Sequence, residues 1–226
     1  QSKRIWGWFF YDWACQPFYT LMLTFFFAPY FATVAADYFV ASGMEIEASK
    51  AKAQTMWSIC LSASGLFIGI SAPILGAIAD TSGRRMPWIY VFSIMLIVGA
   101  LGTWVGVPDG SNLTLMLYFF ALGYIGTEFA LIFTNAQLTT LGNQNEIGKI
   151  SGSGFGFGYL GGVFALAIAL LFLVEQPNGT TFMLGIEPLF GFLNPENMEG
   201  TRFVGPLAAI WFIAVSYTHL TLPTIP

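Results

Sequence analysis

Charged side chains are scarce in this 226-residue chain, which has 8 Lys and Arg and 12 Asp and Glu, or 9% of its residues. A typical soluble protein has about 25%. Hydrophobic residues make up 56% of the chain, so its few charged side chains could not cover a soluble fold of this size. The net charge of −4 also excludes a nucleic-acid-binding protein, because such proteins neutralise phosphates with Lys and Arg.

Cysteine and histidine are nearly absent. The two cysteines, Cys15 and Cys60, lie in apolar runs and allow neither a disulfide framework nor a zinc site. The single histidine, His219, leaves no Ser-His-Asp triad and no HExxH motif. We therefore expect no metal and no cofactor. An intramembrane enzyme is a weak alternative, because no apolar run carries paired carboxylates either.

The chain contains long apolar runs instead. A membrane-spanning helix needs about 20 apolar residues. The runs do not alternate with polar residues, which excludes a transmembrane barrel. We predict an all-α transmembrane bundle of six helices in residues 1–215, spanning about 13–38, 56–79, 87–106, 113–141, 150–174 and 203–215. The sixth run is short, and Pro17 and Pro29 are expected to break or kink the first.

Lys and Arg in the connections predict the orientation, since cytoplasmic loops carry an excess of them. One side carries five: Lys3, Arg4, Arg84, Arg85 and Lys149. The other side carries three: Lys50, Lys52 and Arg202. The N-terminus and the turn at 80–86 are therefore predicted to be cytoplasmic.

The turn after the second run reads GAIADTSGRR, residues 76–85. Gly76 would let helices approach closely, and Gly83 would supply a turn conformation that a side chain resists. Asp80 ends the helix, and Arg84 and Arg85 hold the turn at the cytoplasmic side. An ordinary positive loop explains the arginines but not the Gly, Asp and Gly at fixed offsets before them.

This G-x-x-x-D-x-x-G-R-R pattern resembles the signature loop of the major facilitator superfamily. The resemblance implies that Asp80, Gly83, Arg84 and Arg85 latch one face of a transporter shut against a partner half. It also implies the N-terminal half of a twelve-helix fold, completed in the bilayer by a missing C-terminal half or by a second copy of the chain.

Two longer stretches, 6–31 (WGWFFYDWACQPFYTLMLTFFFAPYF) and 133–162 (FTNAQLTTLGNQNEIGKISGSGFGFGYLGG), resemble the vacuolar amino-acid effluxer branch of that superfamily. The resemblance covers most of residues 6–175. It implies secondary active transport of a small solute, plausibly amino acids, by alternating access. A bacterial inner membrane and a vacuolar membrane both suit such a protein.

Glu128 is the only charged residue in the fourth run. On a helical wheel it lies within about 40° of Tyr124 and Asn135. Such a polar stripe faces a cavity or another helix rather than lipid. One interpretation is a substrate or proton site, because burial favours the neutral, protonated form of a carboxyl group. The other is a structural hydrogen bond between helices. The facilitator resemblance favours the first.

Asp12 is the second acidic candidate. It shares one face with Gln16 and Tyr19, at i, i+4 and i+7, which would place it on a substrate or ion path. The alternative is that Asp12 caps the start of the spanning helix.

Gly154, Gly158 and Gly162 recur every four residues in the fifth run, which predicts a close-packing face. Gly65 and Gly69 in the second run are interpreted in the same way. The G-x-G-x-x-G at 156–161 is not a dinucleotide site, because no strand precedes it.

Residues 216–226 (SYTHLTLPTIP) interrupt the sixth run and resemble translated sequencing adapter, so we expect a non-native tail. A second functional hypothesis stays open, a membrane scaffold that binds a partner through the 175–202 loop without transport.

Overall fold

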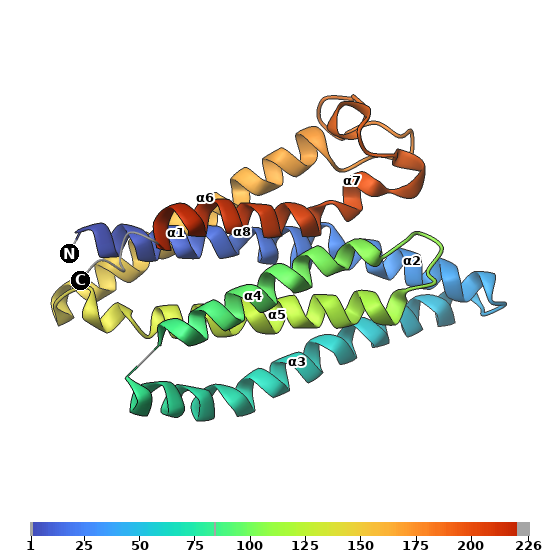
Figure 1. The fold of residues 1–226 in the computed structure, drawn as a ribbon. Helices are drawn as coiled ribbons and strands as arrows, with labels where there is room; N and C mark the ends of the chain where they lie inside the picture. Colours follow the sequence, from blue (N-terminus) through green and yellow to red (C-terminus); the bar gives the residue numbers. More distant parts are fainter. Residues whose placement is uncertain (1, 84, 221–226) are drawn as a thin grey trace.

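The computed structural model describes residues 2–83 and 85–220 and shows an all-helical bundle (Figure 1). Arg84 and residues 221–226 lie outside the described residues. The long helices are α1 (Ser2–Pro17), α2 (Phe27–Ala41), α3 (Ile46–Ser82), α4 (Met86–Gly102), α5 (Leu113–Asn135), α6 (Gln144–Phe172) and α8 (Val204–Leu220). The short ones are the π-helix η1 (Phe18–Phe25), the 3-10 helices η2 (Thr103–Val105), η3 (Leu138–Thr140), η4 (Pro188–Gly191) and η5 (Pro195–Asn197), and α7 (Glu199–Arg202).

Within the described residues, five helical segments are long and apolar enough to cross a membrane: Ser2–Ala41, Ile46–Thr81, Met86–Val105, Leu113–Thr140 and Gln144–Phe172. The prediction of an all-α bundle with long apolar helices is confirmed. The sixth predicted span corresponds to α8, which has 17 residues. It is about 26 Å long at 1.5 Å per residue, a little short of a ~30 Å hydrocarbon core. It continues past the predicted end at residue 215, into the segment that we expected to be a tail.

The first pass through the membrane, Ser2–Ala41, is interrupted near both of its prolines. The α-helical pattern changes to a π-helix directly after Pro17, as expected for a residue that has no N–H to donate. A second bend falls at Phe26, so Pro29 lies in the first turn of α2. The bend lies in the turn directly before Pro29, where the proline ring crowds the preceding carbonyl groups, so the expected break near Pro29 is present as well.

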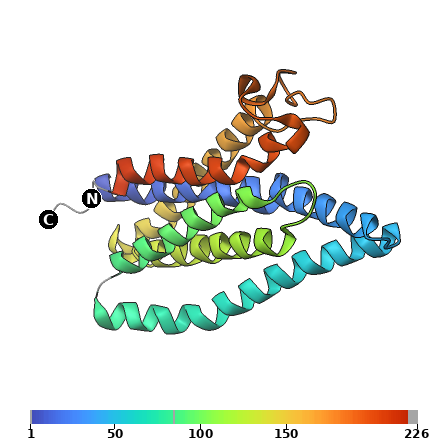
Figure 2. The ribbon, with the colours of Figure 1, turned by 45° about the vertical axis from the view of Figure 1, so that its right-hand side comes forward.

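The second pass is longer than its apolar run. α3 begins at Ile46 rather than near residue 56, because Glu45 caps it by accepting a hydrogen bond from the backbone N–H of Ala48 (3.0 Å). At 37 residues, α3 is about 55 Å long and exceeds the hydrocarbon core. Figure 2 shows it as the outermost helix, with one broad side free of neighbouring helices.

The closest helix contact is between α4 and α5. A Cβ at Gly99 would lie within 3 Å of the backbone of both Gly123 and Phe119, and a Cβ at Gly126 would clash with the backbone of Phe92 and Leu96. Stacked rings of Phe92 with Phe129, 4.7 Å apart, fill the space beside this contact. The backbones of α4 and α5 are therefore tightly packed against each other in the middle of the bundle.

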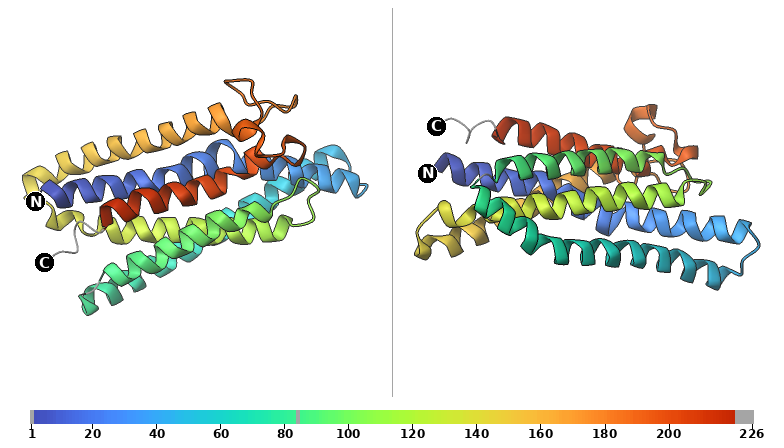
Figure 3. Two further views of the ribbon diagram at one scale, coloured as in Figure 1. Left: turned by 45° about the horizontal axis from the view of Figure 1, so that its top comes forward. Right: turned by 60° about the horizontal axis from the view of Figure 1, so that its bottom comes forward.

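The connections gather at the two ends of the bundle. Figure 3 shows the start of α1, the α3–α4 turn and the α5–α6 turn at one end, and the α2–α3 turn and the 173–203 segment at the other. Arg202, which is 7% exposed, anchors the 173–203 segment to η2. Its guanidinium donates to the backbone carbonyl of Trp104 (2.7 Å) and lies over the Trp104 ring.

Candidate functional site

A cavity of about 860 Å³ opens between the first pass, α5 and α6. This volume lies within the range of about 300–1,000 Å³ that is usual for small-molecule pockets. Its polar lining comes from Asp12, Gln16, Tyr19, Thr20, Thr24, Glu128, Asn135 and Ser151, and its aromatic lining from Trp8, Phe25, Phe155 and Tyr159. The two acidic candidates of the sequence, from spans far apart in the chain, therefore meet in one cavity.

On the first pass, Asp12, Gln16 and Tyr19 all line this cavity, as their shared helical face predicts. Asp12 lies inside α1, which begins ten residues earlier at Ser2. The alternative interpretation of Asp12 as a helix cap is therefore wrong, because the interfacial segment before it is helical too. Gln16 is 7% exposed and belongs to the wall of the cavity rather than to its mouth.

On α5, Glu128 lies opposite Tyr19. The Tyr19 hydroxyl donates a hydrogen bond of 2.8 Å to Glu128 Oε1, which joins residues 109 positions apart. Glu128 therefore contacts another helix and lines the cavity at the same time. Asn135 also lines the cavity, two turns further along α5. Tyr124 is not among the lining residues. Its ring stacks on Phe120, with centroids 6.0 Å apart, and its hydroxyl interacts with the Glu128 carboxyl group.

Two polar atoms of the cavity wall are buried without a hydrogen-bond partner in the described part of the chain. They are the acceptor Asp12 Oδ2 and the donor Trp8 Nε1. Leaving a buried polar atom unpaired costs about 1–3 kcal/mol. Both atoms have almost no exposed surface, so their unused hydrogen-bonding capacity lies inside the cavity wall rather than in its open space.

Sequence reasoning missed the contribution of α6 to the lining. Ser151, Phe155 and Tyr159 follow one another at intervals of four residues and face the cavity. The rings of Phe155 and Tyr159 meet edge to face, with centroids 4.9 Å apart. The four-residue spacing of these polar and aromatic residues, beside the glycine pattern, is a signal that could have found them.

The glycines of α6 lie against the first pass. A Cβ at Gly154 would overlap Trp8, one at Gly158 would overlap Asp12 and one at Gly162 would overlap Thr20. Each of these three partners lines the cavity, so the glycines decide how close α6 comes to it. Gly65, Gly69 and Gly76 on α3 differ, since a Cβ on any of them would meet no described atom within 4 Å. The packing role expected for these three stays a prediction.

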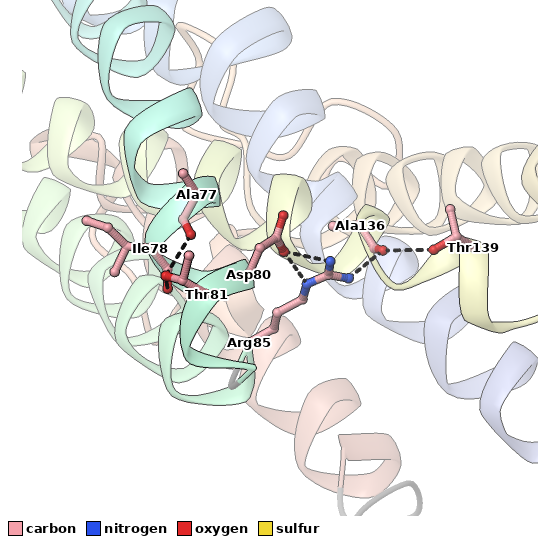
Figure 4. A network of polar contacts seen from close by, with 7 residues as sticks. All are labelled: Ala77, Ile78, Asp80, Thr81, Arg85, Ala136 and Thr139. Carbon is pink, nitrogen blue, oxygen red and sulfur yellow. Dashed lines mark hydrogen bonds and ion pairs between the residues drawn. The ribbon is translucent and has the colours of Figure 1, made fainter.

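The turn between α3 and α4 is arranged around Arg85 (Figure 4). Gly83 ends α3 with a φ of +63°, a conformation that favours glycine. Asp80 Oδ1 accepts two hydrogen bonds from Arg85, of 3.1 and 2.7 Å. The third donor of Arg85 reaches the carbonyl of Ala136 at the C-terminal end of α5 (2.7 Å). Asp80 and Arg85 therefore connect helices of this chain, and Arg84 lies outside the described residues.

The described residues contain no group of three His, Cys, Asp or Glu side chains that could hold a metal ion. The chemistry available in the cavity is that of two carboxyl groups, hydroxyls, amides and aromatic faces.

Comparison with known proteins gives one relevant similarity. The chain is 27% identical over 176 residues to a Bacillus subtilis (strain 168) protein named as the uncharacterized MFS-type transporter YxiO, where MFS stands for major facilitator superfamily. The match covers 77% of this chain and 39% of that protein, so the chain spans about two fifths of the length of this relative. No protein-family model and no solved structure matches.

The five apolar helices and this similarity indicate a multi-pass integral membrane protein, and the similarity suggests a transporter rather than an enzyme. It supports membership of the major facilitator superfamily. It gives no support to the vacuolar amino-acid effluxer branch expected from residues 6–31 and 133–162.

Proposed function

We propose that this chain is the N-terminal half of a facilitator-type secondary transporter and that its solute binds in the cavity between the first pass, α5 and α6. The observation that carries the proposal is the Tyr19–Glu128 hydrogen bond inside that cavity. An ionisable residue within a membrane span is costly and marks a solute or ion path more often than a lipid-facing surface. Similarity to a protein named as a transporter points the same way.

In this proposal Glu128 takes up and releases a proton as the solute moves, and Tyr19 holds its carboxyl group in place. Transport follows alternating access, in which two bundles rock around a site near the midplane. Amino acids are the solute class implied by the resemblance of residues 6–31 and 133–162, and efflux is the direction it implies. Asp80, Gly83, Arg84 and Arg85 would latch the cytoplasmic face.

Replacing Glu128 tests the proton step. Proteoliposomes of the complete protein that contains this sequence are loaded with a pH-sensitive dye, and an amino-acid mixture is added outside. We expect solute-dependent proton movement with the wild type. Glu128→Gln should lose it, because the amide keeps the shape of the carboxyl group but carries no proton. Glu196→Gln is the matched control, since Glu196 is exposed and lies outside the cavity.

Unchanged proton movement in Glu128→Gln would make Glu128 structural. Solute flux without proton movement would support the transport function and reject its coupling to protons. If neither amino acids nor organic amines moved, the scaffold hypothesis for the 175–202 loop would become the better one.

The partner of this bundle is the second part of the proposal. A single bundle encloses only one side of a midplane site, so a C-terminal half or a second copy of the chain must supply the other side. We expect genomic DNA to continue the reading frame after the codon for Val215 with further apolar runs, and without the residues of 216–226. A frame that ends at Pro226 would leave the homodimer as the only transporter arrangement and would favour the scaffold hypothesis.

A further inference from the structure

The charge of the cavity wall has one sign. Asp12 and Glu128 are the charged residues among those that line the cavity, and the lining drawn from the described residues includes no Lys, Arg or His. Two carboxyl groups in a site walled by apolar helices focus a negative potential, because field lines are screened little in a low dielectric. Such a site attracts cations and repels carboxylates.

The two carboxyl groups are not equivalent. Glu128 Oε1 already accepts the hydrogen bond of Tyr19. Asp12 Oδ2 is buried and has no donor among the described residues. It lies against Gly158 of α6, where the absence of a side chain leaves room for it. Oδ2 therefore packs at the contact between α1 and α6, and a solute in the cavity meets the remaining surface of the partly exposed Asp12 carboxyl group.

Aromatic residues complete the wall. Phe155 and Tyr159 are both more than half exposed and line the cavity from α6, while Trp8 lines it from α1. The faces of such rings attract cations. The Nε1 of Trp8 is buried, so Trp8 contributes the apolar surface of its ring rather than its N–H to the cavity.

We propose that the cavity selects a solute of net positive charge, an organic amine whose ammonium group binds Asp12 and whose apolar part lies against the aromatic residues of α1 and α6. This proposal rests on the proposed function, because it names the solute class of the same cavity. It also narrows that function. A zwitterionic amino acid would bring its carboxylate toward a wall in which the described residues offer two acidic groups and no cation.

A series of ligands with one ring and different charges tests this. Binding of phenylalanine methyl ester (cation), phenylalanine (zwitterion), N-acetylphenylalanine methyl ester (neutral) and N-acetylphenylalanine (anion) is measured by isothermal titration calorimetry on the complete protein in lipid nanodiscs. We expect the cation to bind at least about tenfold more tightly than the other three, which corresponds to 1.4 kcal/mol or more.

Variants then locate the site. Asp12→Asn should weaken binding of the ester by about tenfold or more and remove the preference for the cation. Asp37→Asn, an exposed acidic residue outside the cavity, should leave both unchanged. The thermal unfolding midpoint of each variant shows whether it is folded. The ligand series on the wild type needs no variant, so a misfolded Asp12→Asn would not remove the test.

Several results would overturn the proposal. They are phenylalanine binding as tightly as its ester, the anion binding best, no binding of the ester to the wild type, or equal effects of Asp12→Asn and Asp37→Asn. Tight binding of phenylalanine together with proton-coupled flux would reject the amine class and keep the transporter. Binding of the ester without any solute flux would keep the amine site and reject transport.

Discussion

At the residue scale, the cavity depends on small side chains as much as on charged ones. Gly158 lies directly behind Asp12, and Gly161 faces the backbone carbonyl of Trp13, 2.7 Å from the place that a Cβ would occupy. Asp12 can sit at this helix contact because Gly158 has no side chain. The carboxyl group and the glycine therefore act as one feature, although they lie on different helices.

Gly158→Ala tests whether the close contact between α6 and Asp12, rather than helix propensity, determines the stability at this position. Its Cβ would overlap Asp12 Oδ2, so either Asp12 or the whole of α1 must move. We expect a loss of unfolding free energy of about 1–3 kcal/mol, the usual range for overpacking. Gly156→Ala on the same helix meets no atom within 4 Å and should gain up to about 1 kcal/mol from helix propensity.

The measurement is reversible unfolding of both variants in the same detergent micelles. Equal stability of Gly158→Ala and Gly156→Ala would show that α6 does not approach Asp12 as closely as described.

At the element scale, the first pass through the membrane departs from a regular α-helix, because a π-helix lies between α1 and α2. Its π-helix, η1, contributes Tyr19, Thr20 and Thr24 to the cavity. π-Helical segments are rare and occur frequently at functional sites, since the extra residue redirects side chains. Here the change of helix type falls next to the residue that binds Glu128.

The 173–203 segment contains a partly buried carboxyl group, that of Glu175. Glu175 accepts a hydrogen bond from the backbone N–H of Thr201 (3.0 Å), while its other oxygen has no partner among the described residues. Burial raises the pKa of Glu175, although the N–H of Thr201 and the nearby Arg202 oppose the shift. The folded protein therefore keeps this proton at a pH where the unfolded chain has released it.

This difference predicts a pH dependence. Because the folded state binds more protons, stability should fall as the pH rises from about 4.3, the ordinary pKa of Glu, through the raised value. Glu175→Gln should remove that part of the slope, since its amide does not titrate. Thermal midpoints measured between about pH 4 and 7 test this, with Glu196→Gln as the control that should keep the slope. The prediction would be contradicted if the wild type became more stable over this pH interval and Glu175→Gln showed the same pH dependence.

At the scale of the whole molecule, the order of the helices places the connections at two ends of the bundle (Figure 3). The start of α1 lies at the same end as the turn that holds Arg85, so one orientation accounts for both groups of basic residues. We propose that this end is cytoplasmic, because cytoplasmic connections carry the excess of Lys and Arg.

Cysteine labelling tests the orientation. Thr81 is exposed at the end of α3 and Ser111 is exposed at the opposite end, before α5. With Cys60 replaced by Ser and Cys15 left buried, a membrane-impermeant maleimide should label Ser111→Cys in intact cells. Thr81→Cys should be labelled only after the cells are opened. The reverse pattern would place the Arg85 turn outside.

The sequence by itself determined the class of the protein, the six apolar runs, the break at Pro17 and the two acidic candidates. These follow from properties of short segments, since a run is apolar or not whatever surrounds it. Only the tertiary structure decided that Tyr19 pairs with Glu128, that α6 contributes Tyr159 to the cavity and that Gly158 makes room for Asp12. Each depends on how one helix is rotated and packed against another, and the hydrophobic pattern leaves that rotation open because lipid and protein neighbours are equally apolar.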